Sequence, residues 1–246
     1  MTKINQAFIF AAGRGERMRP LTDKTPKPLI KIKDKSIIDY SIEKLNQISD
    51  IKKIIINGFY LAEQIEDHIK KLGNPKIIFS REVSKVETGG GLLFAQDKIN
   101  FDEPLLTING DILWQEKSAI SDIELLCKTW DPKEHDILLG LTKTDEYLGY
   151  DGNNHGGGDF EMEAGKLFRF PDLPMKYVFV GLQIINPKIL LKAKETGVGE
   201  CFSMSHFYKS AVGEGGLLHR VSGVELKGKY FHIGTPEAVR MTEENL

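Results

Sequence analysis

The stretch AFIFAAGRGERMRPLTDKTPKPL, residues 7–29, contains the first strand of the fold and the loop that follows it. The first four residues of this stretch, 7–10, are all uncharged and predict a buried strand. The loop after them carries two closely spaced glycines, three arginines and a lysine between two prolines, Pro26-Lys27-Pro28. Glycines let backbone N–H groups approach an anion, and arginine and lysine side chains suit phosphate oxygens. The stretch therefore predicts a strand followed by a stiff cationic loop that holds a polyphosphate, the alternative being an ordinary surface turn.

The spacing of this loop differs from two common phosphate-binding motifs. A P-loop needs Gly-Lys-Ser/Thr, which the loop lacks. The dinucleotide fingerprint needs a glycine three residues after Gly15, where Met18 stands. A nicotinamide dehydrogenase is therefore disfavoured.

Short apolar runs alternate with amphipathic stretches over the first 142 residues. Strands are expected at 7–10, 53–56, 76–79, 104–108 and 136–141, and helices at 36–48 (with Ser36 as N-cap), 61–72, 90–98 and 118–129. Continuous β-branched strands are typical of a parallel sheet that is buried on both faces. The alternation predicts an α/β fold, with right-handed βαβ units in a Rossmann-like, doubly wound and mostly parallel sheet.

The pattern changes after residue 142. We expect a Gly-rich loop at 147–159, a hairpin at 160–170, strands at 177–186, 217–221 and 230–233, and helices at 187–194, 204–212 and 236–245. The sequence contains no repeat and no linker, which favours one domain over residues 1–246. In this interpretation residues 1–142 form a nucleotide-binding half, and residues 143–246 form a β-rich sugar-binding cover and a closing helix.

Composition and charge favour a soluble cytoplasmic protein. Charged residues make up 28% of the 246 residues, and the net charge is −2. With this balance the protein has no overall positive electrostatic field that would attract nucleic acid or an anionic membrane, and the apolar runs are too short to span a bilayer. Cys127 and Cys201 have no metal or redox spacing and are expected to be reduced and partly buried. A monomer and a small homo-oligomer are both compatible with the sequence.

Two further motifs follow expected strands, where ligands bind in open α/β sheets. Asn109-Gly110-Asp111 places a carboxylate after the fourth strand. One carboxylate together with substrate phosphates commonly holds Mg²⁺, although an Asn-Gly turn is the alternative. Residues 87–91, ETGGG, contain three glycines that are costly at a helix start and suit a flat ring lying against the backbone. Asn57, after the second strand, is a candidate for the same pocket.

These motifs together resemble the sugar-1-phosphate nucleotidylyltransferases. The resemblance rests first on GRGERMRPLT at 13–22 and TPKPL at 25–29. Adding ETGGG, NGD and HGGGDF at 155–160 makes the chain similar to the N-acetylmuramate-1-phosphate uridylyltransferases of bacterial cell-wall recycling. The resemblance covers residues 6–241.

The resemblance implies transfer of a uridylyl group from UTP to a sugar 1-phosphate, with release of pyrophosphate and with Mg²⁺ or Mn²⁺ as cofactor. It implies that Lys27 acts near the α-phosphate, Arg17 on the leaving pyrophosphate and Asp111 as the metal ligand. Other implied nucleotide-binding residues are Ala11, Ala12, Gly13, Arg14, Gly15, Asn57, Thr88, Gly89, Gly90 and Asn109. The residues implied for the sugar are Gly158, Asp159 and Gly181.

His232 is the second candidate metal ligand, but it departs from the family pattern, because most members have a metal-binding aspartate there. An imidazole favours softer ions such as Mn²⁺ or Zn²⁺, and it can also contact a phosphate when protonated or serve a purely structural role. Three other functions stay open. They are a mannose-1-phosphate guanylyltransferase, a glucose-1-phosphate uridylyl- or thymidylyltransferase, and a non-catalytic nucleotide-sugar sensor.

Overall fold

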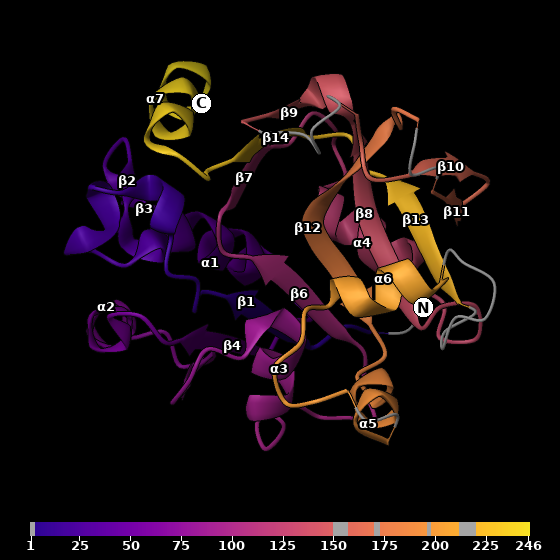
Figure 1. The fold of residues 1–246 in the computed structure, drawn as a ribbon, viewed down its shortest axis with the longest axis horizontal. Helices are drawn as coiled ribbons and strands as arrows, with labels where there is room; N and C mark the ends of the chain where they lie inside the picture. The colour runs from indigo at the N-terminus through magenta and orange to yellow at the C-terminus, as the bar shows by residue number, and fades with distance from the viewer. Residues whose placement is uncertain (1–2, 150–156, 170–172, 196–197, 212–219) are drawn as a thin grey trace.

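The computed structural model describes residues 3–149, 157–169, 173–195, 198–211 and 220–246. Its central sheet has the strand order β10-β11-β13-β8-β12-β6-β1-β4-β5 (Figure 1). The strands are β1 (Gln6–Phe10), β4 (Lys53–Gly58), β5 (Ile77–Arg81), β6 (Leu105–Asn109), β8 (Ile137–Lys143), β10 (Glu161–Glu163), β11 (Lys166–Phe168), β12 (Tyr177–Ile185) and β13 (Val221–Glu225).

Most strands of this sheet run in one direction. β6, β1, β4 and β5 are parallel neighbours, and β8 is parallel to β13. β12 lies antiparallel between β6 and β8, and β11 is antiparallel to both β10 and β13. The predicted α/β fold with a mostly parallel sheet is therefore confirmed. The parallel strands end at one edge, where the loops after β1, β4, β5 and β6 meet.

Helices cover both faces of the sheet. α1 (Ile37–Gln47), α2 (Ala62–Leu72) and α4 (Asp122–Thr129) pack on one face, where their apolar residues join one core cluster. α3 (Glu87–Phe94), α5 (Lys188–Glu195) and α6 (Ser205–Ala211) lie on the other face, where α3 and α5 pack against each other (Figure 1). The burial of Ile38, Ile42 and Leu45 along α1 is the helical periodicity expected from the sequence.

A second, three-stranded sheet closes the carboxyl edge. β14 (Lys229–His232) pairs antiparallel with β7 (Ile112–Gln115) and parallel with β9 (Tyr147–Leu148), and α7 (Pro236–Asn245) follows. This pairing places His232 opposite Ile112, directly after Asp111. The remaining short elements are β2 (Lys31–Ile32), β3 (Lys35–Ser36) and the 3₁₀ turns Glu16–Met18, Leu21–Asp23, Lys27–Leu29 and Thr144–Glu146.

Several expected boundaries were wrong. α3 starts at Glu87 instead of 90, because its glycines lie inside the helix against another segment. α4 starts at Asp122 instead of 118, because Ser121 and Glu124 form a capping box. The strand expected at 217–221 is β13, Val221–Glu225, whose register is set by β8; residues 217–219 lie outside the described part.

Two other expectations about single residues need correction. Ser36 is the N-cap of α1, but within the described residues its side chain makes no capping hydrogen bond. Cys201 is exposed instead of partly buried, whereas Cys127 is partly buried as expected. Burial raises the pKa of the Cys127 thiol to about 12, so this thiol is unreactive at neutral pH.

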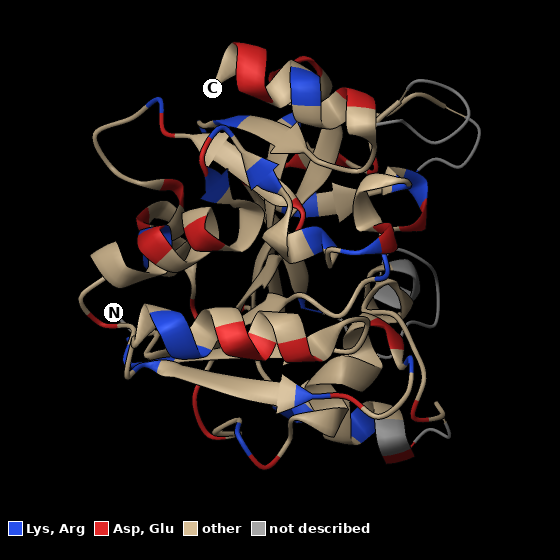
Figure 2. Ribbon diagram, turned by 90° about the vertical axis from the view of Figure 1, so that its left-hand side faces the viewer, with Lys and Arg blue, Asp and Glu red and all other residues tan. Residues whose placement is uncertain are grey.

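Acidic and basic side chains are interspersed on the helices, as Figure 2 shows for the face that carries α2. This mixture agrees with the net charge of −2. Within the described ranges, no helix is long and apolar enough to cross a membrane.

Candidate active site

A cleft lies at the carboxyl ends of β1, β4 and β6. Its larger part has a volume of about 640 Å³ and a smaller part has about 200 Å³, and both are lined by Phe10, Gly13, Gly15, Lys27 and Thr88. Of the predicted site residues, the larger part is also lined by Ala12, Arg14, Arg17 and Asn57, and the smaller part by Ala11, Asn109 and Asp111. The structure therefore brings the predicted phosphate loop and the NGD motif to one cavity.

The loop after β1 is fixed from both sides. Gly15 has a φ of +65°, and a Cβ there would lie 3.1 Å from the Cβ of Lys27, so glycine allows the loop to fold closely over the lysine. Thr22 Oγ1 donates a hydrogen bond of 2.8 Å to Gly15 O. From the α2 side, Tyr60 and Gln64 donate to the carbonyls of Thr22 and Lys24 at 3.1 Å each. These bonds hold the cationic loop in place.

A buried network connects the ends of β1, β4 and β5. Asn57 Oδ1 accepts a hydrogen bond of 2.6 Å from the N–H of Ala11, and Asn57 Nδ2 donates one of 2.7 Å to Glu82 Oε1. Gly91 of α3 lies against both side chains, since a Cβ there would be 2.8 Å from Glu82 Oε1. Asn57 therefore positions the start of the loop after β1. The sequence indicated Asn57 only as a possible pocket residue.

Replacing Glu82 with glutamine is expected to stabilise the protein at high pH. Burial raises the pKa of Glu82, and the hydrogen bond from Asn57 only partly opposes this shift. The folded state therefore binds this proton more tightly than the unfolded state, and stability is lost as the pH rises through the folded pKa. Glu82→Gln keeps the Oε1 acceptor without the charge, so we expect a melting temperature about 1–3 °C higher at pH 8.

The matched control is Glu66→Gln on the surface of α2. Hydrogen bonds from Lys70 and Arg81 lower the pKa of Glu66, so its replacement should give no stabilisation at pH 8. Thermal unfolding of both variants between pH 4.5 and 8 measures the effect. An equal or lower melting temperature for Glu82→Gln at pH 8 would contradict the argument.

Lys27, Asp111 and His232 form the charged centre of the cleft. Lys27 Nζ lies 2.7 Å from Asp111 Oδ2, and His232 Nε2 lies 3.5 Å from the same oxygen. Burial opposes ionisation of Asp111, but Lys27 and His232 outweigh it and hold the pKa of this carboxyl well below its usual range. Asp111 is therefore an anion at neutral pH, and both contacts use one of its two oxygens.

The ring of His232 is held in place by its surroundings. Nδ1 lies 3.3 Å from the carbonyl oxygen of Gly149, and the ring centroid is 6.3 Å from that of Tyr147. A carbonyl only accepts hydrogen bonds, so the tautomer with its hydrogen on Nδ1 satisfies this contact, and Nε2 is then the nitrogen that faces Asp111. In this tautomer Nε2 and the Asp111 carboxylate can both act as metal ligands.

Asp111 and His232 are the side chains of the cleft that could hold a metal ion. Within the described residues, no group of three or more His, Cys, Asp and Glu side chains is arranged so that it could hold one. Mg²⁺ is typically held by one or two carboxylates together with substrate phosphates, and Mn²⁺ also accepts imidazole. Asp111 and His232 fit an ion whose remaining ligands come from substrate and water.

Gly89 and Gly90 face the protein interior with their N–H groups. Both donate to Phe202 O, at 2.8 and 3.0 Å. A Cβ on Gly89 would lie 2.2 Å from the Phe202 ring, and one on Gly90 would lie 2.2 Å from Glu200 O. These glycines therefore serve close packing of residues 200–202. Binding of the nucleobase stays a prediction. Because the N–H groups of Gly89 and Gly90 already have a partner, other groups would have to contact the base, such as the carbonyls of these glycines or Thr88, which lines the cleft.

Gly181, one of the residues predicted to bind the sugar, lies against Asn109 of the NGD motif. It has a φ of +77° at a bulge in β12, and a Cβ there would lie 2.7 Å from Asn109 Nδ2. Gly158 and Asp159 lie near the start of the same strand. Gly158 N donates to Met175 O at 2.6 Å, and Asp159 Oδ2 accepts from Phe179 N at 3.0 Å. These contacts attach Asp159 to β12 and Gly158 to Met175, just before that strand. His155 lies outside the described residues.

Replacing Gly181 with alanine is expected to lower activity by about tenfold, because the new Cβ would displace Asn109 beside Asp111. Gly73→Ala is the matched control. Gly73 also has positive φ, +60°, but a Cβ there would meet nothing within 4 Å. Both variants carry the backbone strain, so a loss of kcat/KM in Gly181→Ala alone identifies the contact with Asn109. Equal kinetics in the two variants would contradict it.

Several residues of the cleft were not among the site residues predicted from the sequence. Phe10, Phe59, Lys85, Glu87 and Gly234 also line it. Phe59 directly follows Asn57-Gly58, so its place after a strand was an available signal. A Cβ on Gly234 would lie 2.9 Å from the His232 ring and 3.2 Å from an Arg17 guanidinium nitrogen, which places Arg17 and His232 over the same turn. No feature of the sequence around Lys85 indicated that this residue would line the cleft.

Comparisons with known proteins agree with this geometry. The family model described as nucleotidyl transferase matches residues 6–200. An N-acetylmuramate alpha-1-phosphate uridylyltransferase of Caulobacter vibrioides is 33% identical over 98% of this chain and 96% of its own length. The catalytic subunit beta of a mannose-1-phosphate guanylyltransferase of Dictyostelium discoideum is 30% identical over 78% of this chain and 53% of its own length.

Solved structures share the fold. An inositol-1-phosphate CTP transferase from T. maritima superimposes with a TM-score of 0.76 over 98% of this chain and 94% of that protein, at 16% identity. The identity is too low to carry function, so this likeness supports the architecture alone. The match over residues 6–200 and the full-length relative establish more: the chain is an enzyme of the nucleotidyl transferase family.

Proposed function

We propose that this protein transfers a uridylyl group from UTP to N-acetylmuramate α-1-phosphate, giving the UDP-sugar and pyrophosphate. The observation that carries the proposal is the Lys27–Asp111 pair at 2.7 Å, in a cleft whose one wall is the cationic loop. The full-length relative from Caulobacter vibrioides supports the choice of uridylyl group and sugar. In this proposal the enzyme works in the cytoplasm and returns a cell-wall sugar to synthesis.

The residues of the cleft act by position and charge. A phosphate oxygen of the sugar 1-phosphate attacks the α-phosphorus of UTP, and the bond to pyrophosphate breaks in line, so no covalent nucleophile is needed. Lys27 neutralises charge on the transferred phosphoryl group, and Arg17 neutralises charge on the leaving pyrophosphate. A Mg²⁺ or Mn²⁺ ion held by Asp111 and His232 would supply further charge neutralisation when bound. Gly181 and Asn109 keep the sugar side adjacent to this centre.

A substrate panel tests the proposal. Pyrophosphate release is measured for UTP, GTP, dTTP and CTP, each with N-acetylmuramate, mannose and glucose 1-phosphates. We expect kcat/KM for UTP with N-acetylmuramate 1-phosphate to exceed every other pair by at least about tenfold. A guanylyltransferase is the second candidate, since the Dictyostelium relative carries that name, and it would favour GTP with mannose 1-phosphate. UTP binding without turnover of any pair would instead indicate a sensor.

A further inference from the structure

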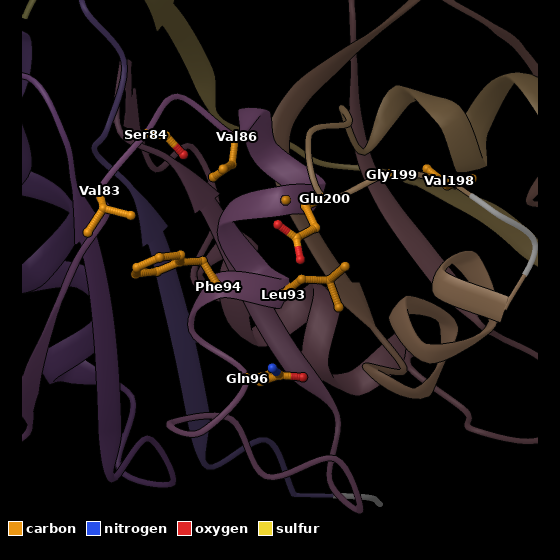
Figure 3. A pocket seen from close by; sticks show the side chains of 10 residues that line it. Val83, Ser84, Val86, Leu93, Phe94, Gln96, Val198, Gly199 and Glu200 are labelled. Atoms are coloured by element: carbon orange, nitrogen blue, oxygen red, sulfur yellow. The ribbon is translucent and has the colours of Figure 1, made fainter.

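A second cavity, of about 330 Å³, lies beside α3 (Figure 3). In the described part of the chain, it shares no lining residue with the active-site cleft. One wall is α3, and the other is formed by Val83, Ser84, Val86 and residues 198–200. A cavity of this size accommodates a small organic molecule.

The lining combines exposed apolar side chains with one carboxylate. Val83 is 81% exposed and Phe94 is 38% exposed, although both are large hydrophobic residues. The Glu200 carboxylate points between Val86 and Leu93, as Figure 3 shows. Glu200 is exposed, and among the described residues its carboxylate has no ion-pair partner that would compete with a ligand. An apolar surface beside an unpaired carboxylate suits a ligand with an apolar body and a cationic end.

This cavity is physically connected to the cleft through residues 200–204. Gly89 N and Gly90 N both donate to Phe202 O, and Phe202 N donates to Val86 O at 3.2 Å. Met204 N donates to Thr88 Oγ1 at 2.8 Å. Val86, Gly90 and Glu200 line the second cavity, whereas Thr88 lines the cleft. The same short segment therefore borders one cavity and holds the wall of the other.

We propose that the second cavity is a regulatory site for a small organic amine with an aromatic or aliphatic body. The ammonium group pairs with Glu200, and the apolar body packs on Phe94, Leu93 and Val83. Occupancy adds a contact between Glu200 and α3 to these existing hydrogen bonds, restrains residues 200–204 and Thr88 further, and so tightens nucleotide binding in the cleft. The regulatory effect rests on the proposed function, whereas the binding site itself does not.

Three probes that differ only in the end group test the site. Tryptamine is cationic, tryptophol is neutral and indole-3-propionate is anionic, and binding of each to the full chain is measured by calorimetry. We expect tryptamine to saturate one site, tryptophol to bind more weakly and indole-3-propionate not to bind. Glu200→Gln should weaken tryptamine binding about tenfold, the value of a charge-assisted hydrogen bond.

Glu195→Gln, an exposed change on α5, is the matched control and should leave tryptamine affinity unchanged. Equal binding of the three probes, no saturable binding, or the same loss in both variants would overturn the site. A thermal melt of each variant confirms that it is folded.

The coupling has a separate readout. UTP affinity is measured with and without saturating tryptamine, and we expect it to rise about fivefold, the lower end of known allosteric couplings. The same tryptamine concentration should have a much smaller effect on Glu200→Gln. Tryptamine binding with unchanged UTP affinity would overturn the regulatory role. If UTP does not bind at all while tryptamine still binds through Glu200, the proposed function fails and the second site stands.

Discussion

Lys27→Ala is expected to reduce kcat by about a hundredfold or more, with the fold retained. The lysine is largely enclosed beneath the loop, and its ammonium group lies 2.7 Å from Asp111. Alanine removes a preorganised positive charge from the position where phosphate charge develops, and little solvent rearrangement can replace it. It also leaves Asp111 without its nearest cation. Single-turnover kinetics at saturating UTP separate this loss from a change in binding.

Lys24→Ala is the matched control, because Lys24 lies on the same loop but is exposed. Lys24→Ala lowers the charge of the loop by the same amount as Lys27→Ala. Because solvent and salt screen an exposed charge, kcat should change by less than about twofold. Lys27→Arg tests geometry, since arginine keeps the charge but has a wider head group. A near-normal rate in Lys27→Ala would contradict the assignment of this residue.

Asp111→Asn is expected to reduce kcat by about a thousandfold, because electrostatic stabilisation at a phosphoryl centre is worth several kcal/mol. The neutral amide keeps the shape of the side chain but removes the charge that Lys27 and His232 both face. Calorimetric titration with Mn²⁺ should show a matching loss of affinity if Asp111 holds a metal ion. The measurement is made with UTP present, because substrate supplies part of the ligand set.

Asp97→Asn is the control for this change, since Asp97 is an exposed carboxylate that also pairs with a lysine, Lys98. It should keep full activity and unchanged Mn²⁺ binding. Activity of Asp111→Asn within tenfold of the native rate would exclude Asp111 as the principal metal ligand. Lost activity with intact Mn²⁺ binding would instead assign the carboxylate to the positioning of Lys27.

The local parts of the site were predictable from the sequence. The strand at 7–10 and the loop after it carry their signals in neighbouring residues, and so does the NGD turn after β6. Because parallel strands end at one edge of the sheet, these segments had to meet there once the α/β pattern was recognised. The cleft that joins Lys27 to Asp111 follows from this rule.

The parts that depend on distant pairing were not predictable. β7 follows Asp111 immediately, but it forms only because β14 pairs with it from the far end of the chain. Gly89 and Gly90 looked like a surface for a ring, whereas their partner is Phe202, more than a hundred residues later. A single sequence contains no signal for such contacts, so the packing of these two glycines against Phe202 could not be predicted.

The register in which β7 pairs with β14 sets the distance between Asp111 and His232. His232 pairs with Ile112, and Ile233 N donates to Asp111 O at 2.8 Å. Neighbouring residues of a strand point to opposite faces, so a slip of one position would present Phe231 or Ile233 in place of the imidazole. Residues 226–228 lead from β13 into β14, so a change of length there could shift this register although the segment lies outside the cleft. An insertion there that shifts the register should move His232 away from Asp111 and lower the activity.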